Sequence, residues 1–242
     1  MPRGQPDYGE YAVKEVSASV SDMGEVAARL GSIVTFDKRG DVVDFDNFEE
    51  PVLRWCTIVS EAGNYVRFSN DSASSGSQSV RLHVEGAALG RAGMHSGIPL
   101  LGSLRLGMEI SFAVPTLGGY LALEVSYFTG SKLCDAILKF YFSTLKLYLI
   151  NDTGSDEEVA SLERFINSAY VYHTLKLVGD FNTGKYVRLL LDNLTYDISH
   201  IAMYSQTDLT SPCLERNVNY YPFNSVGGDV YLDDFVFTQA EP

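Results

Sequence analysis

The stretch LRLGMEISFAV, residues 104–114, indicates the fold class of this chain. Its apolar residues, Leu104, Leu106, Met108, Ile110 and Phe112, recur at every second position. Successive side chains of a β-strand point to opposite sides of the sheet, so these five residues form one apolar face. Such a strand is typical of an antiparallel sheet that packs one face on a core and leaves the other face to water.

The same period of two recurs on both sides of this stretch, and Gly, Asn, Asp and Ser residues separate the segments. The connection Asp180–Gly184 predicts a β-hairpin with glycine in the turn. Segment 157–166 fits either a short helix or a twisted strand. The further predicted strands lie at 79–85, 120–128, 138–142, 144–150, 172–178, 186–191 and 230–237.

This pattern predicts an all-β fold, an antiparallel two-sheet jelly-roll sandwich that forms a single domain over residues 40–242. An extended N-terminal arm over residues 1–39 precedes it. Within the arm, Asp22 and Glu25 form a capping pair that starts one short helix, which Gly31 ends. A chain of 242 residues buries enough surface to fold without disulfides, and its three scattered cysteines predict none.

The chain is acidic, with 31 Asp and Glu against 18 Lys and Arg and a net charge of −13. The excess lies at the two ends of the sequence and not in the middle. Nucleic acids and anionic membranes are bound by clustered Lys and Arg, so we expect neither as a partner. The N-terminus has no apolar signal segment and no run of eighteen apolar residues follows, so we expect a soluble protein without membrane insertion.

Three short motifs carry a resemblance to a known group of proteins. They are DFDNFE at 44–49 followed by Trp55, SASSGSQSVRL at 72–82, and VYLDDFV at 230–236. Over residues 40–238 the chain resembles the jelly-roll sandwiches of the concanavalin-like and carbohydrate-binding-module group. This group includes lectin-like domains, binding modules, glycoside hydrolases, polysaccharide lyases and virion proteins, so the resemblance implies a fold and no single function.

The resemblance implies a structural calcium ion held by acids of the first and last strands. Independently, the first and last strands of such a sandwich are commonly neighbours, so their acids would repel one another without a cation or a basic partner. The alternative is a set of solvated edge acids that discourage aggregation. The candidate ligands are Asp46, Glu49, the carbonyl near Gly76, Asp233 and Asp234.

A second candidate site is the polar side of the predicted strands, which is rich in tyrosine. We expect these residues on one sheet face: Tyr120, Glu124, Lys139, Tyr141, Tyr148, Tyr172, Tyr186 and Arg188. Tyrosines among charged groups suit a glycan groove or a protein interface. They also occur as cross-strand pairs that only stabilise a solvated sheet, or beneath an arm of the same chain.

Motifs of catalysis are absent from the sequence. Sandwich glycosidases carry alternating acids on one strand, whereas this chain has no E-x-D-x-E motif, and its nearest analogue, Asp44-x-Asp46, lies in the opening motif. No G-x-S-x-G motif occurs, and the four histidines are scattered. The sequence therefore predicts a protein that is not an enzyme, with a glycosidase or lyase of degenerate motifs as the remaining alternative.

A Pro- and Gly-rich arm that leads into a sandwich is typical of subunits that link to their neighbours. The leading hypothesis is thus a structural assembly protein, a capsid-decorating or tail component of a virion or similar particle, with copies of itself or other particle subunits as partners. The alternative is a carbohydrate-binding module or lectin-like adhesion domain with a glycan as its partner.

Overall fold

The structure is a computed structural model that describes residues 39–85, 90–223 and 226–242. Strands and connecting loops, without a helix, make up these described residues, which confirms the all-β prediction. The predicted arm and its short helix lie outside them, apart from Arg39. The strands are Asp41–Asp46 (β1), Cys56–Ser60 (β2), Tyr65–Ser69 (β3), Ser79–Val84 (β4), Arg91–Ile98 (β5), Arg105–Ala113 (β6), Tyr120–Phe128 (β7), Lys132–Tyr141 (β8), Lys146–Ile150 (β9), Asp156–Ser161 (β10), His173–Asp180 (β11), Lys185–Leu191 (β12), Leu194–Asp197 (β13), Tyr204–Thr207 (β14), Cys213–Tyr221 (β15) and Gly228–Gln239 (β16).

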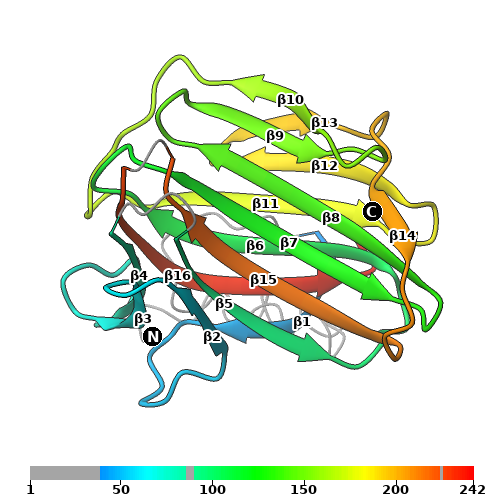
Figure 1. Cartoon of the computed structure of the whole chain (residues 1–242), viewed down its shortest axis with the longest axis horizontal. Helices are drawn as coiled ribbons and strands as arrows, with labels where there is room; N and C mark the ends of the chain where they lie inside the picture. The colour runs from blue at the N-terminus through cyan, green and yellow to red at the C-terminus, as the bar shows by residue number, and fades with distance from the viewer. Residues whose placement is uncertain (1–38, 86–89, 224–225) are drawn as a thin grey trace, which may run out of the picture.

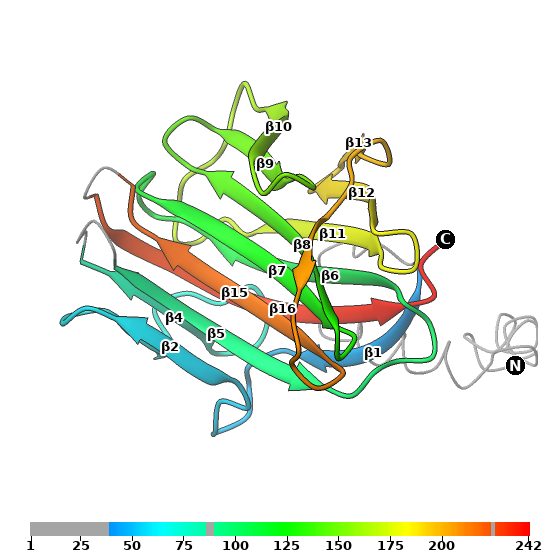
Figure 2. The same ribbon diagram turned by 45° about the vertical axis from the view of Figure 1, so that its right-hand side comes forward.

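Two antiparallel sheets form the molecule, as predicted. Sheet A has the order β13-β12-β11-β6-β16-β4-β3, with β1 also paired to β16. Sheet B has the order β10-β9-β8-β7-β15-β5-β2, with β14 paired to β8. In Figure 1 sheet B faces the viewer and sheet A lies behind it, and Figure 2 shows the same two layers obliquely, after a turn of 45°.

The first and last described strands are neighbours, which confirms the expectation that the two acidic ends of the chain meet. Strand β1 pairs with the second half of β16, from Asp41 opposite Gln239 to Asp46 opposite Phe235. A β-bulge interrupts the pairing of β16 with β6 after Asp233. Bulges re-aim side chains, and this one sets the neighbouring acids of β16 at the end of β1.

The core lies between the sheets and consists of the apolar faces that the alternation predicts. Leu106, Met108, Ile110 and Phe112 of β6 are fully buried, and Phe112 packs edge-on against Phe140 of β8 with ring centroids 6.1 Å apart. Burying apolar surface of this kind is the main favourable contribution to folding.

Two local predictions are settled by the structure. The ambiguous segment begins with a strand, β10, that pairs with β9, so its helical spacing is overridden by sheet pairing. The predicted hairpin joins β11 to β12, and Gly184 in its turn has a φ of +66°. In the described part of the chain we find no helix long and apolar enough to cross a bilayer.

Candidate functional site

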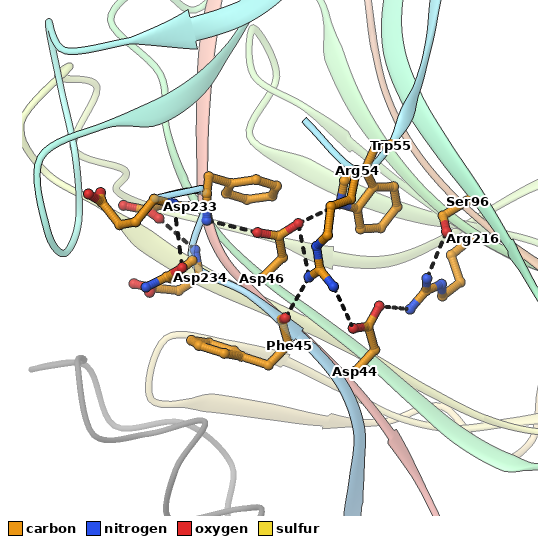
Figure 3. A network of polar contacts seen from close by, with 12 residues as sticks. Asp44, Phe45, Asp46, Arg54, Trp55, Ser96, Arg216, Asp233 and Asp234 are labelled. Atoms are coloured by element: carbon orange, nitrogen blue, oxygen red, sulfur yellow. Dashed lines mark hydrogen bonds and ion pairs between the residues drawn. The ribbon is translucent and has the colours of Figure 1, made fainter. Parts of the chain in front are cut away.

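The junction of β1 and β16 holds the residues predicted to bind calcium, and Figure 3 shows their contacts. Asp46 is buried, with Oδ1 accepting the backbone N–H of Phe48 at 2.9 Å and Oδ2 accepting the indole N–H of Trp55 at 3.0 Å. The guanidinium of Arg54 lies 3.2 Å from the same Oδ2. The negative charge of Asp46 is therefore balanced within the chain.

Glu49 is held by the loop that contains Gly76. Its Oε1 accepts the backbone N–H groups of Ser77 at 2.8 Å and Gln78 at 2.9 Å, and its Oε2 accepts the Ser77 hydroxyl at 2.8 Å. Burial raises the pKa of Glu49, but these bonds outweigh burial and leave the pKa below its usual value. Gly76 has a φ of +66°, and a Cβ there would lie 2.4 Å from Oε1 of Glu49, so this loop requires glycine.

The two acids of β16 lie side by side beneath the same loop. Oδ2 of Asp233 accepts the N–H groups of Ser74 at 2.7 Å and Ser75 at 3.1 Å, and its Oδ1 accepts the N–H of Asp234 at 2.8 Å. Burial and the adjacent charge of Asp234 raise the pKa of Asp233 to about 7. Oδ1 of Asp234 accepts the Ser75 hydroxyl at 2.8 Å, whereas its buried Oδ2 has no hydrogen-bond partner.

Calcium is bound by six to eight oxygen atoms. Most carboxylate oxygens predicted to provide them already accept hydrogen bonds from the chain. Within the described ranges, no group of three or more His, Cys, Asp or Glu side chains is placed to hold a metal ion. The calcium ion stays a prediction, and its remaining support is the unpartnered Oδ2 of Asp234.

Arg216 extends this network into the core between the sheets. It projects from β15 of sheet B and donates to Oδ2 of Asp44 on β1 at 2.7 Å and to the Ser96 hydroxyl at 2.9 Å. Its guanidinium carbon also lies 5.3 Å and 5.2 Å from the ring centroids of Phe235 and Phe237. Arg216 thus links the two sheets and balances a second acid of the opening strand.

The predicted tyrosine face is wrong as a single surface, because the structure divides its residues between the two sheets. Five lie on sheet B: Tyr120, Glu124, Lys139, Tyr141 and Tyr148. The other three belong to sheet A or to the segment just before it: Tyr172, Tyr186 and Arg188.

A register shift between β11 and β12 explains why Tyr186 and Arg188 point to different sides. Gly179 pairs with Tyr186 and Val178 with Arg188, so the extra residue between them reverses the alternation. Tyr186 lies in the core, where its hydroxyl donates to the backbone carbonyl of Ile150 at 2.9 Å. Neither side chain is available to a ligand on sheet B.

Glu241 and Pro242 pack against part of the outer face of sheet A. The carboxylate of Glu241 lies 2.7 Å from Nζ of Lys176 and contacts the guanidinium of Arg188, and all three side chains are buried. Arg188 also donates to the backbone carbonyl of Pro242 at 2.7 Å. We name Glu241, Lys176 and Arg188 the Glu241 socket. Tyr172, on the same face, accepts a hydrogen bond from the Ser72 hydroxyl at 3.0 Å.

The outer face of sheet B carries a row of stacked rings, which we name the tyrosine ladder: Tyr141, Tyr120 and Tyr221, on β8, β7 and β15. The ring centroid of Tyr120 lies 4.6 Å from that of Tyr141 and 4.8 Å from that of Tyr221. Both neighbours stack on the central ring, so the ladder offers a ligand mainly ring edges and hydroxyl groups. This arrangement agrees with the cross-strand pairing considered from the sequence.

Three acids, which we name the carboxylate cluster, lie on the same outer face: Glu124 of β7, Asp135 of β8 and Glu215 of β15. Ser126 lies directly opposite both Asp135 and Glu215 in the sheet register, and its hydroxyl donates to Oε1 of Glu124 at 3.2 Å. Burial, and next the charge of Asp135, raise the pKa of Glu124. Burial likewise raises the pKa of Asp135, whose buried Oδ1 has no hydrogen-bond partner.

Polar neutral groups surround the cluster on β15 and β5. Asn217 lies opposite Glu124 on one side and opposite His95 on the other. Asn219, the next outward residue on β15, is buried against Gly93, where a Cβ would lie 2.0 Å from its Oδ1. These amides provide both donors and acceptors beside the carboxylates.

Asp135, Glu215 and Tyr221 belong to this face but are not among the residues predicted from the sequence. Extending the alternation of Lys139 and Tyr141 backwards along their strand would have placed Asp135 on the same face. Strand β15 was not predicted, because the core position of Arg216 conceals its alternation. No alternation in the sequence around Glu215 indicates that its side chain points outward.

Comparisons with known proteins show the fold. Neither a family model nor a curated protein sequence matches the chain. Among solved structures, an endo-β-1,4-glucuronan lyase from the fungus Trichoderma reesei is 11% identical with a TM-score of 0.55, over 82% of this chain and 96% of that chain. The catalytic domain of an endo-1,3-β-glucanase (laminarinase) from Thermotoga petrophila is 11% identical with a TM-score of 0.50, over 84% and 99% of the two chains.

This protein therefore has the concanavalin-like jelly-roll fold that the sequence motifs resemble. The prediction that the chain is not an enzyme is corrected, because both of these structures of the same fold are enzymes, a lyase and a glucanase. Assembly into a particle is not tested by these comparisons and stays a prediction.

Proposed function

We propose that this protein binds a neutral polysaccharide across the outer face of sheet B and cleaves its glycosidic bonds. The observation that carries the proposal is the carboxylate cluster, in which Glu124 and Asp135 both have raised pKa values on a sheet face that also holds the tyrosine ladder. Acids with raised pKa values beside a binding surface are typical of catalytic sites.

The tyrosine ladder and the amides suit a sugar chain. A sugar ring has apolar C–H groups and polar hydroxyl edges, which tyrosine edges and amide groups can contact together. Between the ladder and the cluster, Ala122 of β7 and Gly93 of β5 lie on either side of Asn219 in the cross-strand register. Small residues there leave room for a ring above the sheet.

Glu124 is the acid in the proposed reaction. Its raised pKa keeps a proton available at higher pH than an ordinary glutamate. It gives this proton to the glycosidic oxygen as the bond from that oxygen to the anomeric carbon breaks. Water then forms a bond to the anomeric carbon and returns one proton to Glu124, while Glu215 stabilises the positive charge that develops on the ring.

The charge of the site favours a neutral substrate. Glu124, Asp135 and Glu215 lie on one face, and Arg91 is the cation whose charge acts on Glu124 there. A uronic acid chain, such as the glucuronan named for the lyase neighbour, would bring further carboxylates close to this cluster and be repelled.

The test is release of reducing ends from neutral β-glucans and xylan by the full chain. We expect Glu124→Gln to lower kcat by a factor of about 10² to 10⁴, because the acid that assists the leaving group is lost. Affinity for the polysaccharide, measured by calorimetry, stays within about threefold, since Gln keeps the shape of the side chain. Glu163→Gln, at an exposed position between β10 and β11, is the matched control and keeps full activity.

Two results contradict the proposal. If the wild-type chain binds neutral polysaccharides but releases no reducing ends, the face is a binding surface only. If unsaturated products appear from uronans instead, the reaction is an elimination and the substrate is charged.

A further inference from the structure

Ser126 connects two members of the carboxylate cluster. Its side chain is buried, its hydroxyl donates to Oε1 of Glu124 at 3.2 Å, and it lies on the strand beside Asp135. Asp135 is directly opposite Ser126 in the sheet register and is 6% exposed, with Oδ1 lacking a partner. A hydroxyl between two carboxyl groups can donate to one and accept from the other.

We propose that Asp135 is a positioning residue that shares a proton with Glu124 through the Ser126 hydroxyl and so keeps Glu124 in its acid form. This inference rests on the proposed function of Glu124 as the acid. Asp135 itself does not touch the substrate, because its side chain is buried between Ser126 of β7 and Tyr204 of β14 in the sheet register.

The surrounding charges support this role. Besides Asp135, the groups that act on Glu124 are Glu215 of β15, which opposes its ionisation, and Arg91 of β5, which favours it. The negative charges of Asp208, which follows β14, and of Glu215 oppose the ionisation of Asp135 in turn. More acids than bases thus face this pair, and two carboxyl groups that cannot both ionise easily hold one proton between them.

A specific pH behaviour follows. The wild-type pair releases its protons in two macroscopic steps, the second at a higher pH than an isolated glutamate. In Asp135→Asn the negative charge that opposes ionisation of Glu124 is gone. The alkaline limb of kcat/KM then moves to lower pH by about one unit or more, and Glu124 titrates in a single step.

The experiment combines pH profiles of activity with an NMR titration of ¹³C-labelled glutamate carboxyl groups in the full chain, with Glu124→Gln assigning the signal. We expect Asp135→Asn to show the full shift and Ser126→Ala a smaller one, because Ala removes the hydroxyl but leaves the charge. Asp152→Asn, at an exposed turn position, is the matched control and keeps the wild-type profile.

The outcomes separate the two proposals. If cleavage requires Glu124 but Asp135→Asn and Asp152→Asn share the wild-type pH profile and titration, the role of Asp135 is overturned and the proposed function stands. If no polysaccharide is cleaved, the proposed function fails, while a single-step Glu124 titration in Asp135→Asn against two steps in the wild type still supports proton sharing.

Discussion

The outer faces of the two sheets differ in whether a nearby cation compensates their buried and half-buried acids. On sheet A, Glu241 is enclosed by Lys176 and Arg188 and its charge is compensated at close range. On sheet B, Glu124 and Asp135 are diagonal neighbours on adjacent strands, neither forms an ion pair with another described residue, and both pKa values are raised. The contrast indicates that Glu241 serves stability, whereas Glu124 and Asp135 are kept at a cost in stability, as is common at functional sites.

The junction of β1 and β16 belongs with sheet A in this comparison. Arg54 and Arg216 balance Asp46 and Asp44, and the backbone of the loop around Gly76 binds Glu49. Arginines and backbone N–H groups of the protein thus neutralise most of the acids where the two acidic ends of the chain meet. Asp233 and Asp234, adjacent and buried, are the exception.

The largest stability effect is expected in the Glu241 socket. Glu241→Gln removes the carboxylate charge that contacts both Lys176 and Arg188 and leaves Lys176 with the more distant carboxylate of Glu109, 3.7 Å away. We therefore expect the free energy of unfolding to fall by about 3–5 kcal/mol. Urea unfolding at pH 7 measures the change, with Glu163→Gln as the exposed control. A loss below about 1 kcal/mol would show that Glu241 contributes little to stability and would contradict the proposed difference between the two faces.

The raised pKa of Asp233 on β16 should make the free energy of unfolding depend on pH. Between about pH 3.9, the usual pKa of an unfolded aspartate, and the folded value for Asp233 of about 7, the unfolded chain releases a proton that the folded chain keeps. The free energy of unfolding therefore falls as pH rises through this window, by up to roughly 4 kcal/mol.

Asp234→Asn tests the cause of this slope. It removes the neighbouring charge that raises the pKa of Asp233, and Asn tolerates the positive φ of 46° at position 234. We expect the fall in stability between pH 4 and pH 7 to become smaller in this variant. A slope equal to that of the wild type would contradict this expectation and leave burial as the main cause of the raised pKa of Asp233.

A smaller effect is expected for Arg216→Met. Methionine fits among the rings of Phe235 and Phe237, but Asp44 loses its closest cation. Because Asp44 is 27% exposed and keeps Arg54 at 3.7 Å, we expect a loss of about 2 kcal/mol, less than in the Glu241 socket. The double variant Arg216→Met with Asp44→Leu should recover part of it, and no recovery would mean that packing dominates.

The sequence predicts those parts of the fold in which the alternation of apolar residues is unbroken. The predicted strand at 104–114 contains β6, the one at 120–128 is β7, and the first and last described strands meet. The alternation fails where a local feature competes with it. Arg216 occupies a core position in β15, and the register shift beside Gly179 turns Tyr186 inward.

The candidate site was predictable only in part for the same reason. Glu124, Tyr120 and Tyr141 lie on strands with regular alternation, so the sequence places them on one face. Their partners Glu215 and Tyr221 come from β15, whose pairing with β7 joins segments far apart in the sequence. No local pattern encodes such a juxtaposition, and a carboxylate cluster assembled across strands has no E-x-D-x-E signature.

The most direct test of the contrast between the two faces is the free energy of unfolding of Glu124→Gln at pH 7. Because the pKa of Glu124 is raised, its ionisation in the folded chain costs stability as pH rises above the usual pKa of glutamate, and removing the charge relieves this cost. We expect a gain of about 0.5–2 kcal/mol, opposite in sign to the loss expected for Glu241→Gln. A loss of stability in Glu124→Gln similar to that in Glu241→Gln would contradict it, since the acid of sheet B would then serve the fold.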